Sequence, residues 1–230
     1  MRRRPLITGL LLAALASTVP AWAQVAPSAS EAATYSGLHA AAHQGDAGKI
    51  ARLVASGAVV NTTDAHGRTP LHVATFARQR EAIRALAKAG ADIDQLENDR
   101  YDAVTIASVA DDEDTLRLLL QLGASAKQTT SRYEGTALIA AAHLGHDGVV
   151  RQLIAAGAPL DHVNNLHWTA VIESIVLGNG GARHQATLRA LIDAGANLQL
   201  TDRNGQTPLA LAKSRGYAAM VAMLEKAGAR

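Results

Sequence analysis

Six stretches of the chain place apolar residues three and four positions apart and then end at a Gly-Ala pair. In one of them Ile83 and Leu86 precede Gly90; in another Leu188 and Leu191 precede Gly195. This spacing predicts a helix with one buried face, and the glycine suits a left-handed helix terminus that a Cβ would disfavour. The glycines of the six pairs are Gly57, Gly90, Gly123, Gly157, Gly195 and Gly228, at intervals of 33, 33, 34, 38 and 33 residues.

A second mark begins another helix in each unit. It reads Thr69-Pro70-Leu71-His72 in one unit and Thr207-Pro208-Leu209 in the last. Threonine caps a helix start, and proline fits the first helical position because its missing N–H would be unpaired there anyway. The four weaker copies start at residues that keep a capping oxygen: Ser36, Asp102, Thr136 and Thr169. Each unit is therefore predicted to hold two helices.

A 33-residue unit with Thr-Pro-Leu-His and a closing Gly-Ala resembles the ankyrin repeat. The resemblance covers residues 34–230 and implies an all-α repeat solenoid of six ankyrin repeats, each a helix-turn-helix plus a loop or short β-hairpin. It also implies that His39 and His72 bond the backbone of the neighbouring loop. The approximate units are 34–63, 64–96, 97–129, 130–163, 164–200 and 201–230.

Two intervals depart from 33 residues. The interval of 34 predicts a lengthened loop near residues 129–133. The interval of 38 places five extra residues between the paired helices of the fifth unit, around residues 178–184. Three glycines in this segment predict a mobile loop, which either serves a function or is a harmless insertion.

The first 23 residues predict a signal peptide. Arg2, Arg3 and Arg4 precede an uncharged apolar stretch, and small residues follow at Ala21 and Ala23, so cleavage is expected after Ala23. The apolar stretch is shorter than the roughly 20 residues that span a bilayer. We therefore expect a periplasmic protein, with secretion into the medium as the alternative and the export route open. Residues 24–33 are expected to form a flexible leader.

Charge and cysteine content narrow the function further. Three of the 22 basic residues and none of the 20 acidic residues lie in the signal, which leaves 19 basic and 20 acidic residues after cleavage. This balance gives no reason to expect a nucleic-acid partner, and no membrane insertion is expected after cleavage. The chain has no cysteine, which excludes thiol catalysis and thiolate metal sites.

The residues suggest no catalytic chemistry. No nucleophile, phosphate-binding or zinc-hydrolase motif is present, and we expect neither an enzyme nor a cofactor or metal. The acidic run 111–114 is predicted to be a solvated turn that leads into a helix. A small-ligand or metal site at the 178–184 loop and the acidic turn is kept as an alternative.

Recognition of another protein is the stronger hypothesis. The resemblance implies binding through loop tips and the exposed side of the inner helices. After residue 23 the chain holds six aromatic residues, and four of them fall on this set in successive units. Aromatic residues and arginine commonly anchor interfaces. The predicted binding residues are His66, Arg68, Phe76, Tyr101, Arg132, Tyr133, His143, Leu144 and Trp168.

These observations predict a monomeric, non-catalytic adaptor, scaffold or inhibitor that binds another exported protein. The resemblance to exported bacterial ankyrin-repeat proteins implies a link to oxidative-stress defence, with a catalase or peroxidase as one expected partner. A secreted effector that acts on host proteins is the alternative.

Overall fold

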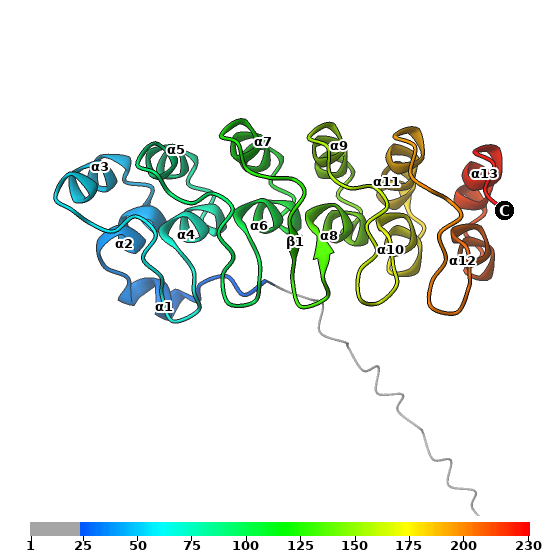
Figure 1. Cartoon of the computed structure of the whole chain (residues 1–230), viewed down its shortest axis with the longest axis horizontal. Coiled ribbons are helices and arrows are strands. Elements are labelled where there is room, and N and C mark those ends of the chain that lie inside the picture. The colour runs from blue at the N-terminus through cyan, green and yellow to red at the C-terminus, as the bar shows by residue number, and fades with distance from the viewer. Residues whose placement is uncertain (1–23) are drawn as a thin grey trace, which may run out of the picture.

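The computed structural model describes residues 24–230, and these residues form two parallel rows of helices (Figure 1). The row of inner helices contains α2 (Gly37–Gln44), α4 (Pro70–Phe76), α6 (Ala103–Val109), α8 (Ala137–Leu144), α10 (Ala170–Val176) and α12 (Pro208–Ser214). The row of outer helices contains α3 (Ala47–Ala55), α5 (Arg80–Lys88), α7 (Glu113–Gln121), α9 (Asp147–Ala155), α11 (Ala182–Asp193) and α13 (Ala218–Lys226). The six predicted helix pairs are confirmed.

Five of the six predicted capping residues of the inner helices are confirmed, whereas Ser36 makes no side-chain hydrogen bond at the start of α2. The Thr69 side chain accepts a hydrogen bond from the backbone N–H of His72, and the N–H of Thr69 donates to His72 Nδ1 at 3.0 Å. Asp102 caps α6 in the same way through the N–H of Thr105. The glycines of the six Gly-Ala pairs all have positive φ, between 79° and 97°, where a side chain would be strained.

The hydrophobic core lies between the two rows and runs the length of the molecule. Ile83 and Leu86 of α5 and Leu116 of α7 are fully buried. Inner helices carry alanines at their closest contacts, such as Ala41 and Ala74, and each packs against the inner helix of the next unit. One helix pair cannot cover its own apolar surface, so each unit depends on its neighbours for stability.

Hairpin loops join the units, and three of these five loops share one internal hydrogen-bond pattern. Asp64 Oδ1 accepts from the backbone N–H groups of His66 and Arg68, each at 2.9 Å. Asn164 and Asp202 accept in the same way from the residues two and four positions further on. In each of these three loops the Asp or Asn side chain thus accepts from two backbone N–H groups of the turn, which gives the loop a defined conformation.

Neighbouring loops are also joined to one another. The N–H of Asn98 donates to the His66 carbonyl at 3.0 Å, and the N–H of Asn165 donates to the Tyr133 carbonyl at 2.9 Å. The lengthened loop predicted near 129–133 is a hairpin of β1 (Thr129–Thr130) and β2 (Gly135–Thr136), paired antiparallel. The loops therefore hold fixed positions relative to one another.

The insertion in the fifth unit does not form the free loop that its glycines predict. Helix α11 has 12 residues, whereas the other outer helices have nine, so three of the five extra residues extend this helix. The Tyr217 hydroxyl donates to the Gly178 carbonyl at 2.9 Å, and Gln185 donates to the Gly180 carbonyl at 2.7 Å. Contacts from the sixth unit and from α11 itself therefore hold the turn.

The leader predicted over residues 24–33 contains a helix, α1 (Ala29–Thr34), that the sequence pattern did not predict. Ser28 and Glu31 form a reciprocal capping box at its start. The predicted signal peptide, 1–23, lies outside the described residues. Among the helices in residues 24–230, none combines the length and the apolar character that crossing a bilayer requires.

Burial of His72 makes the stability of the second unit depend on pH. His72 Nε2 lies 3.0 Å from the Gln95 carbonyl, and Nδ1 caps Thr69, which confirms the predicted role of this imidazole. Burial lowers the pKa of His72 to about 4 from a usual 6.5. The folded state therefore favours the neutral ring, and this contribution is complete above pH 6.5 and is lost as the pH falls towards 4.

We expect the free energy of unfolding to fall by about 3 kcal/mol between pH 6.5 and 4 on account of His72 alone. Urea unfolding at pH 7, 5.5 and 4 measures this loss. A His72→Gln variant has no imidazole to titrate at this position. The difference in unfolding free energy between wild type and variant should therefore become smaller as the pH falls. A gap of constant size would contradict the assignment.

Candidate protein-binding face

The predicted binding residues lie on the tips of the hairpin loops and at the ends of the inner helices. We call this surface the loop face. Three of the nine predicted residues are exposed there: the side chains of His66 and Arg132 are 50% and 70% exposed, and Leu144 is 37% exposed. Five are half-buried: Phe76, Tyr101, Tyr133, His143 and Trp168. Arg68 is buried, at 1% exposure.

The predicted stripe of water-facing aromatic rings is present only in part. Trp168 packs against the hydrophobic core, so it supports its own loop. Burial, followed by the charge of Asp99, raises the pKa of Tyr101, and its nearest charged neighbours include Arg132. Arg132 lies 3.4 Å from Asp99 across adjacent loops. Tyr101, Tyr133 and this ion pair form one half-buried patch between the third and fourth units.

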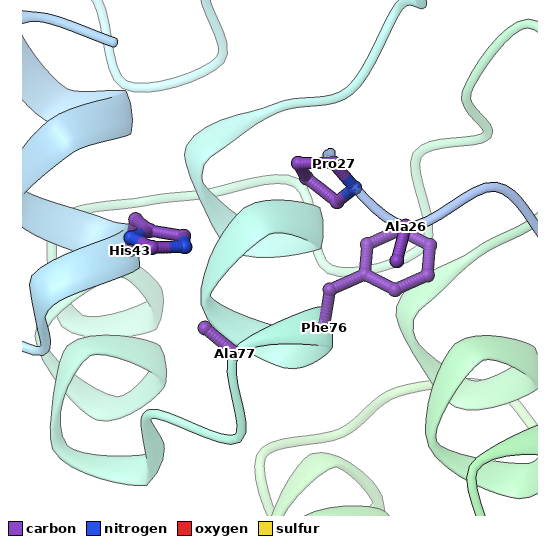
Figure 2. Close-up of a pocket in the computed structure, with 5 residues that line it drawn as sticks. All are labelled: Ala26, Pro27, His43, Phe76 and Ala77. Atoms are coloured by element: carbon purple, nitrogen blue, oxygen red, sulfur yellow. The ribbon is translucent and has the colours of Figure 1, made fainter. Parts of the chain in front are cut away.

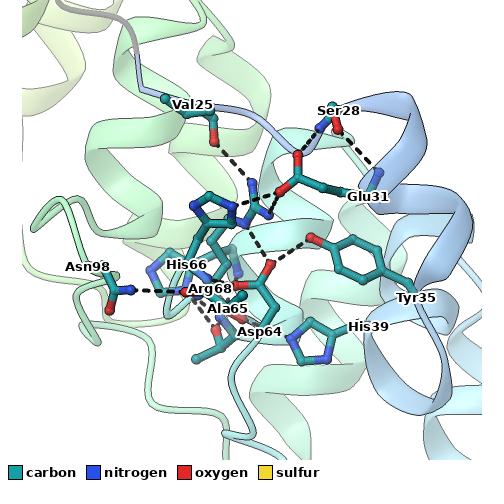
Figure 3. Close-up of polar contacts among 12 residues, drawn as sticks. Val25, Ser28, Glu31, Tyr35, His39, Asp64, Ala65, His66, Arg68 and Asn98 are labelled. Atoms are coloured by element: carbon teal, nitrogen blue, oxygen red, sulfur yellow. Dashed lines mark hydrogen bonds and ion pairs between the residues drawn. The ribbon is translucent and has the colours of Figure 1, made fainter.

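Arg68 was expected to flank the face as an exposed side chain, and this expectation is wrong. Its guanidinium donates to Glu31 Oε1 at 2.7 Å, to Asp64 Oδ2 at 2.7 Å and to the Val25 carbonyl at 3.2 Å (Figure 3). Glu31 and Val25 belong to the leader. The leader therefore covers Arg68 and satisfies donors that would otherwise face water.

The groups around Arg68 form a connected charge cluster. Burial of Asp64 acts to raise its pKa, but hydrogen bonds from Tyr35, Arg68 and the backbone outweigh burial and lower this pKa to about 2. Hydrogen bonds from Ser28, followed by those from Arg68, lower the pKa of Glu31 to about 2. Both carboxylates stay ionised at neutral pH, and His66 Nε2 lies 2.9 Å from Glu31 (Figure 3).

Beyond the leader, the face has an apolar centre at the ends of two inner helices. Leu144 follows α8 residue His143, and Leu177 holds the equivalent place after α10; both are exposed, at 37% and 39%. Beneath them His143 Nδ1 lies 3.4 Å from the buried carboxylate of Glu173. Asn164 donates to the same carboxylate at 2.8 Å. Glu173 therefore has partners and fixes the orientation of His143.

Three exposed tip residues, Arg100, Glu134 and His167, were not among the predicted binding residues. Arg100 and His167 have φ of 66° and 64°, at the loop position that Gly67 and Gly205 occupy in the second and sixth units. A residue with a Cβ costs about 1 kcal/mol in this conformation relative to glycine. The signal was available, since aligning the units places both residues, together with Glu134 of the fourth unit at φ 54°, in a column that holds glycine in the second and sixth units. Strained backbone conformations of this kind are enriched at functional sites.

The acidic turn and the 178–184 segment do come together, as ion pairs. Arg183 contacts Asp111 at 2.8 Å, and Arg80 contacts Asp112 at 3.0 Å. Asp112 caps α7 as predicted for the start of that helix, but it is buried rather than solvated. His146 bonds the Ser108 carbonyl at 2.9 Å. Within residues 24–230 no three His, Cys, Asp or Glu side chains are grouped as metal ligands.

Stacked helix pairs with hydrogen-bonded hairpin tips define a helix-pair repeat solenoid. The family described as ankyrin repeats in three copies matches residues 24–97, and a single ankyrin repeat matches residues 134–165. The ankyrin repeat protein YahD of Escherichia coli (strain K12) is 35% identical over 190 residues, which cover 82% of this chain and 94% of that protein. The chain belongs to the ankyrin-repeat family.

Solved structures agree with this assignment. An ankyrin repeat domain, ABAYE2397, from Acinetobacter baumannii AYE superimposes with a TM-score of 0.79 at 42% identity, over 84% of this chain and 98% of that one. The ankyrin repeat domain of Bcl-3, a member of the IκB protein family, superimposes with a TM-score of 0.76 at 27% identity, over 86% and 88%. Ankyrin repeats typically mediate protein–protein interaction and are typically non-catalytic.

A structural role for Trp168 can be separated from a binding role. Trp168→Ala removes a ring that packs on the core, and we expect a loss of about 2 kcal/mol, less than for a fully buried ring. Arg132→Ala, at an exposed side chain with one long ion pair, should cost less than about 0.5 kcal/mol. Urea unfolding measures both. Equal losses would show that the ring does not support its loop.

Proposed function

We propose that this protein is a periplasmic adaptor, scaffold or inhibitor that binds another exported protein through the loop face of its third to fifth units. It is a monomer in this proposal and carries out no catalysis. The observation that supports the proposal most directly is the pair of tip residues Arg100 and His167, which keep exposed polar side chains in a conformation that favours glycine. Neither side chain is needed to make the turn.

The surroundings of these residues are those of a pre-organised binding surface. Backbone hydrogen bonds join the third, fourth and fifth loops: Ser131 donates to the Arg100 carbonyl at 2.8 Å, and Asn165 donates to the Tyr133 carbonyl at 2.9 Å. Rigid loops lose little conformational entropy on binding. Leu144 and Leu177 add exposed apolar area at the C-terminal ends of two neighbouring inner helices, and interfaces usually combine such apolar area with polar residues around it.

The cellular role is proposed from the predicted signal peptide and from the resemblance to exported ankyrin-repeat proteins. A role in oxidative-stress defence makes a catalase or peroxidase the first partner to look for. A nucleic-acid partner has no support from the charge balance of the residues after the predicted signal, 19 basic and 20 acidic.

A matched pair of leucine variants tests the face. Leu144→Asp places a charge in its apolar centre, and we expect capture of the partner from a periplasmic extract to fall at least tenfold. Leu122→Asp is the control, because Leu122 is equally exposed, at 37%, and also ends a helix, but in the outer row. Affinity capture followed by mass spectrometry compares the two variants. Equal recovery of every partner by both variants would exclude this face.

Export is tested separately with a C-terminally tagged chain. We expect the periplasmic fraction to contain protein whose N-terminus is Gln24, as measured by intact mass. Cytoplasmic protein that retains Met1 would overturn the localisation. Accumulation in the culture medium would support the secreted effector instead.

A further inference from the structure

The leader occupies the part of the loop face that belongs to the first two units. Pro27 and Ala26 lie over a hollow whose other walls are His43, Phe76 and Ala77, at the ends of α2 and α4 (Figure 2). Phe76 stands at the position that His143 holds in the fourth unit, and Ala77 at the position of Leu144. The same surface is therefore open in the fourth and fifth units and covered by the leader in the second.

The leader is held there by recognition of its backbone and of one carboxylate. Arg68 donates to the Val25 carbonyl at 3.2 Å and to Glu31 at 2.7 Å, and His66 approaches the same Glu31 oxygen at 2.9 Å. Arg68 is fixed in this position from below by Asp64 at 2.7 Å, within its own loop. We call Arg68, His66 and the hollow between His43, Phe76 and Ala77 the seat of the leader. It combines a fixed guanidinium with an apolar hollow, which suits an extended segment with an acidic side chain.

The attachment of the leader is local and weak compared with the repeats. No residue of α1 is buried, and a helix of six residues is too short to be stable in isolation. The side chain of Glu31 remains 33% exposed, and Val25 is 58% exposed. A segment with few buried apolar contacts unfolds locally at a lower free-energy cost than the core does.

We propose that the leader is a displaceable occupant of this seat, and that an extended acidic segment of the protein partner takes its place against Arg68, His66 and Phe76. This rests on the proposed function and names the chemistry of the partner. The Arg68 guanidinium and the His66 imidazole would bind the carboxylate of the incoming segment, and the hollow would take its small or proline side chains. The leader then acts as a competitor that raises the specificity of the face.

An exchange experiment with purified components tests the proposal. The probe is a fluorescent peptide with the sequence of residues 24–36, and its anisotropy is titrated with the full chain. Glu31→Gln in the chain weakens its own leader, so we expect this variant to bind the probe at least fivefold more tightly than wild type. Glu81→Gln is the control, because it makes the same charge change at a side chain that is 77% exposed and contacts Arg84 at 3.6 Å.

Two further variants test whether the probe binds at Arg68 and His66. Adding Arg68→Gln to Glu31→Gln should abolish the gain; if that variant fails to fold, His66→Gln at an exposed position should reduce it at least twofold. A probe in which glutamine replaces the glutamate should bind each chain at least fivefold more weakly than the acidic probe binds the same chain. Equal probe affinity for wild type and Glu31→Gln, with unchanged circular dichroism, would overturn the proposal.

A dimer of wild type that disappears in Glu31→Gln would assign the seat to the leader of a second copy and would also overturn the proposal. None of these measurements uses the captured partner or Leu144. Failure of the exchange therefore leaves the proposed function standing, and failure of the capture experiment leaves the exchange standing.

Discussion

Burial of each helix pair against the next is the constraint from which the other features of this chain follow. Apolar side chains such as Ile83 and Leu116 are fully buried only because the neighbouring unit covers them. Close approach of the inner helices requires small side chains, such as those of the buried Ala41 and Ala74. Because stacking fixes the spacing, a histidine of one unit can reach the loop of the next, as His39 reaches the Arg68 carbonyl at 2.8 Å. The packing of the core therefore also sets the spacing of the residues on the binding surface.

This constraint explains why the fold was predictable and parts of the face were not. The helix pairs, the capping residues and the Gly-Ala ends depend on neighbours in sequence, so spacing and residue type were enough to place them. The burial of Arg68 depends on Glu31, 37 positions away in a segment without periodicity. The helix α1 was missed for the same reason, because its capping box follows Pro27 in a short polar stretch that looks like a linker. The position of Trp168 was predicted correctly but its environment was not, since the side on which a ring packs depends on the shape of the adjacent loop.

The insertion shows how a glycine-rich segment can be ordered by its neighbours. Gly178, Gly180 and Gly181 allow the turn, and Tyr217 from the sixth unit closes it. The same turn brings Arg183 to Asp111, 72 positions earlier, and to Asp147 at 3.5 Å. Each of these exposed ion pairs contributes little by itself. With Arg80 at Asp112 and Arg117 at Asp114, arginines pair three of the four carboxylates of the acidic run 111–114, and Gln152 donates to the fourth, Glu113.

The two halves of the loop face are therefore built from the same positions and differ in what covers them. In the second unit the tip carries Gly67, the adjacent Arg68 points into a charge cluster, and the leader completes it. In the third and fifth units the glycine position holds Arg100 and His167, whose side chains are exposed to solvent. A partner that bound only the open half would need no acidic segment, whereas one that extended across the whole face must replace the contacts that Glu31 makes. The binding free energy of such a partner would then be that of the full face less the free energy needed to displace the leader.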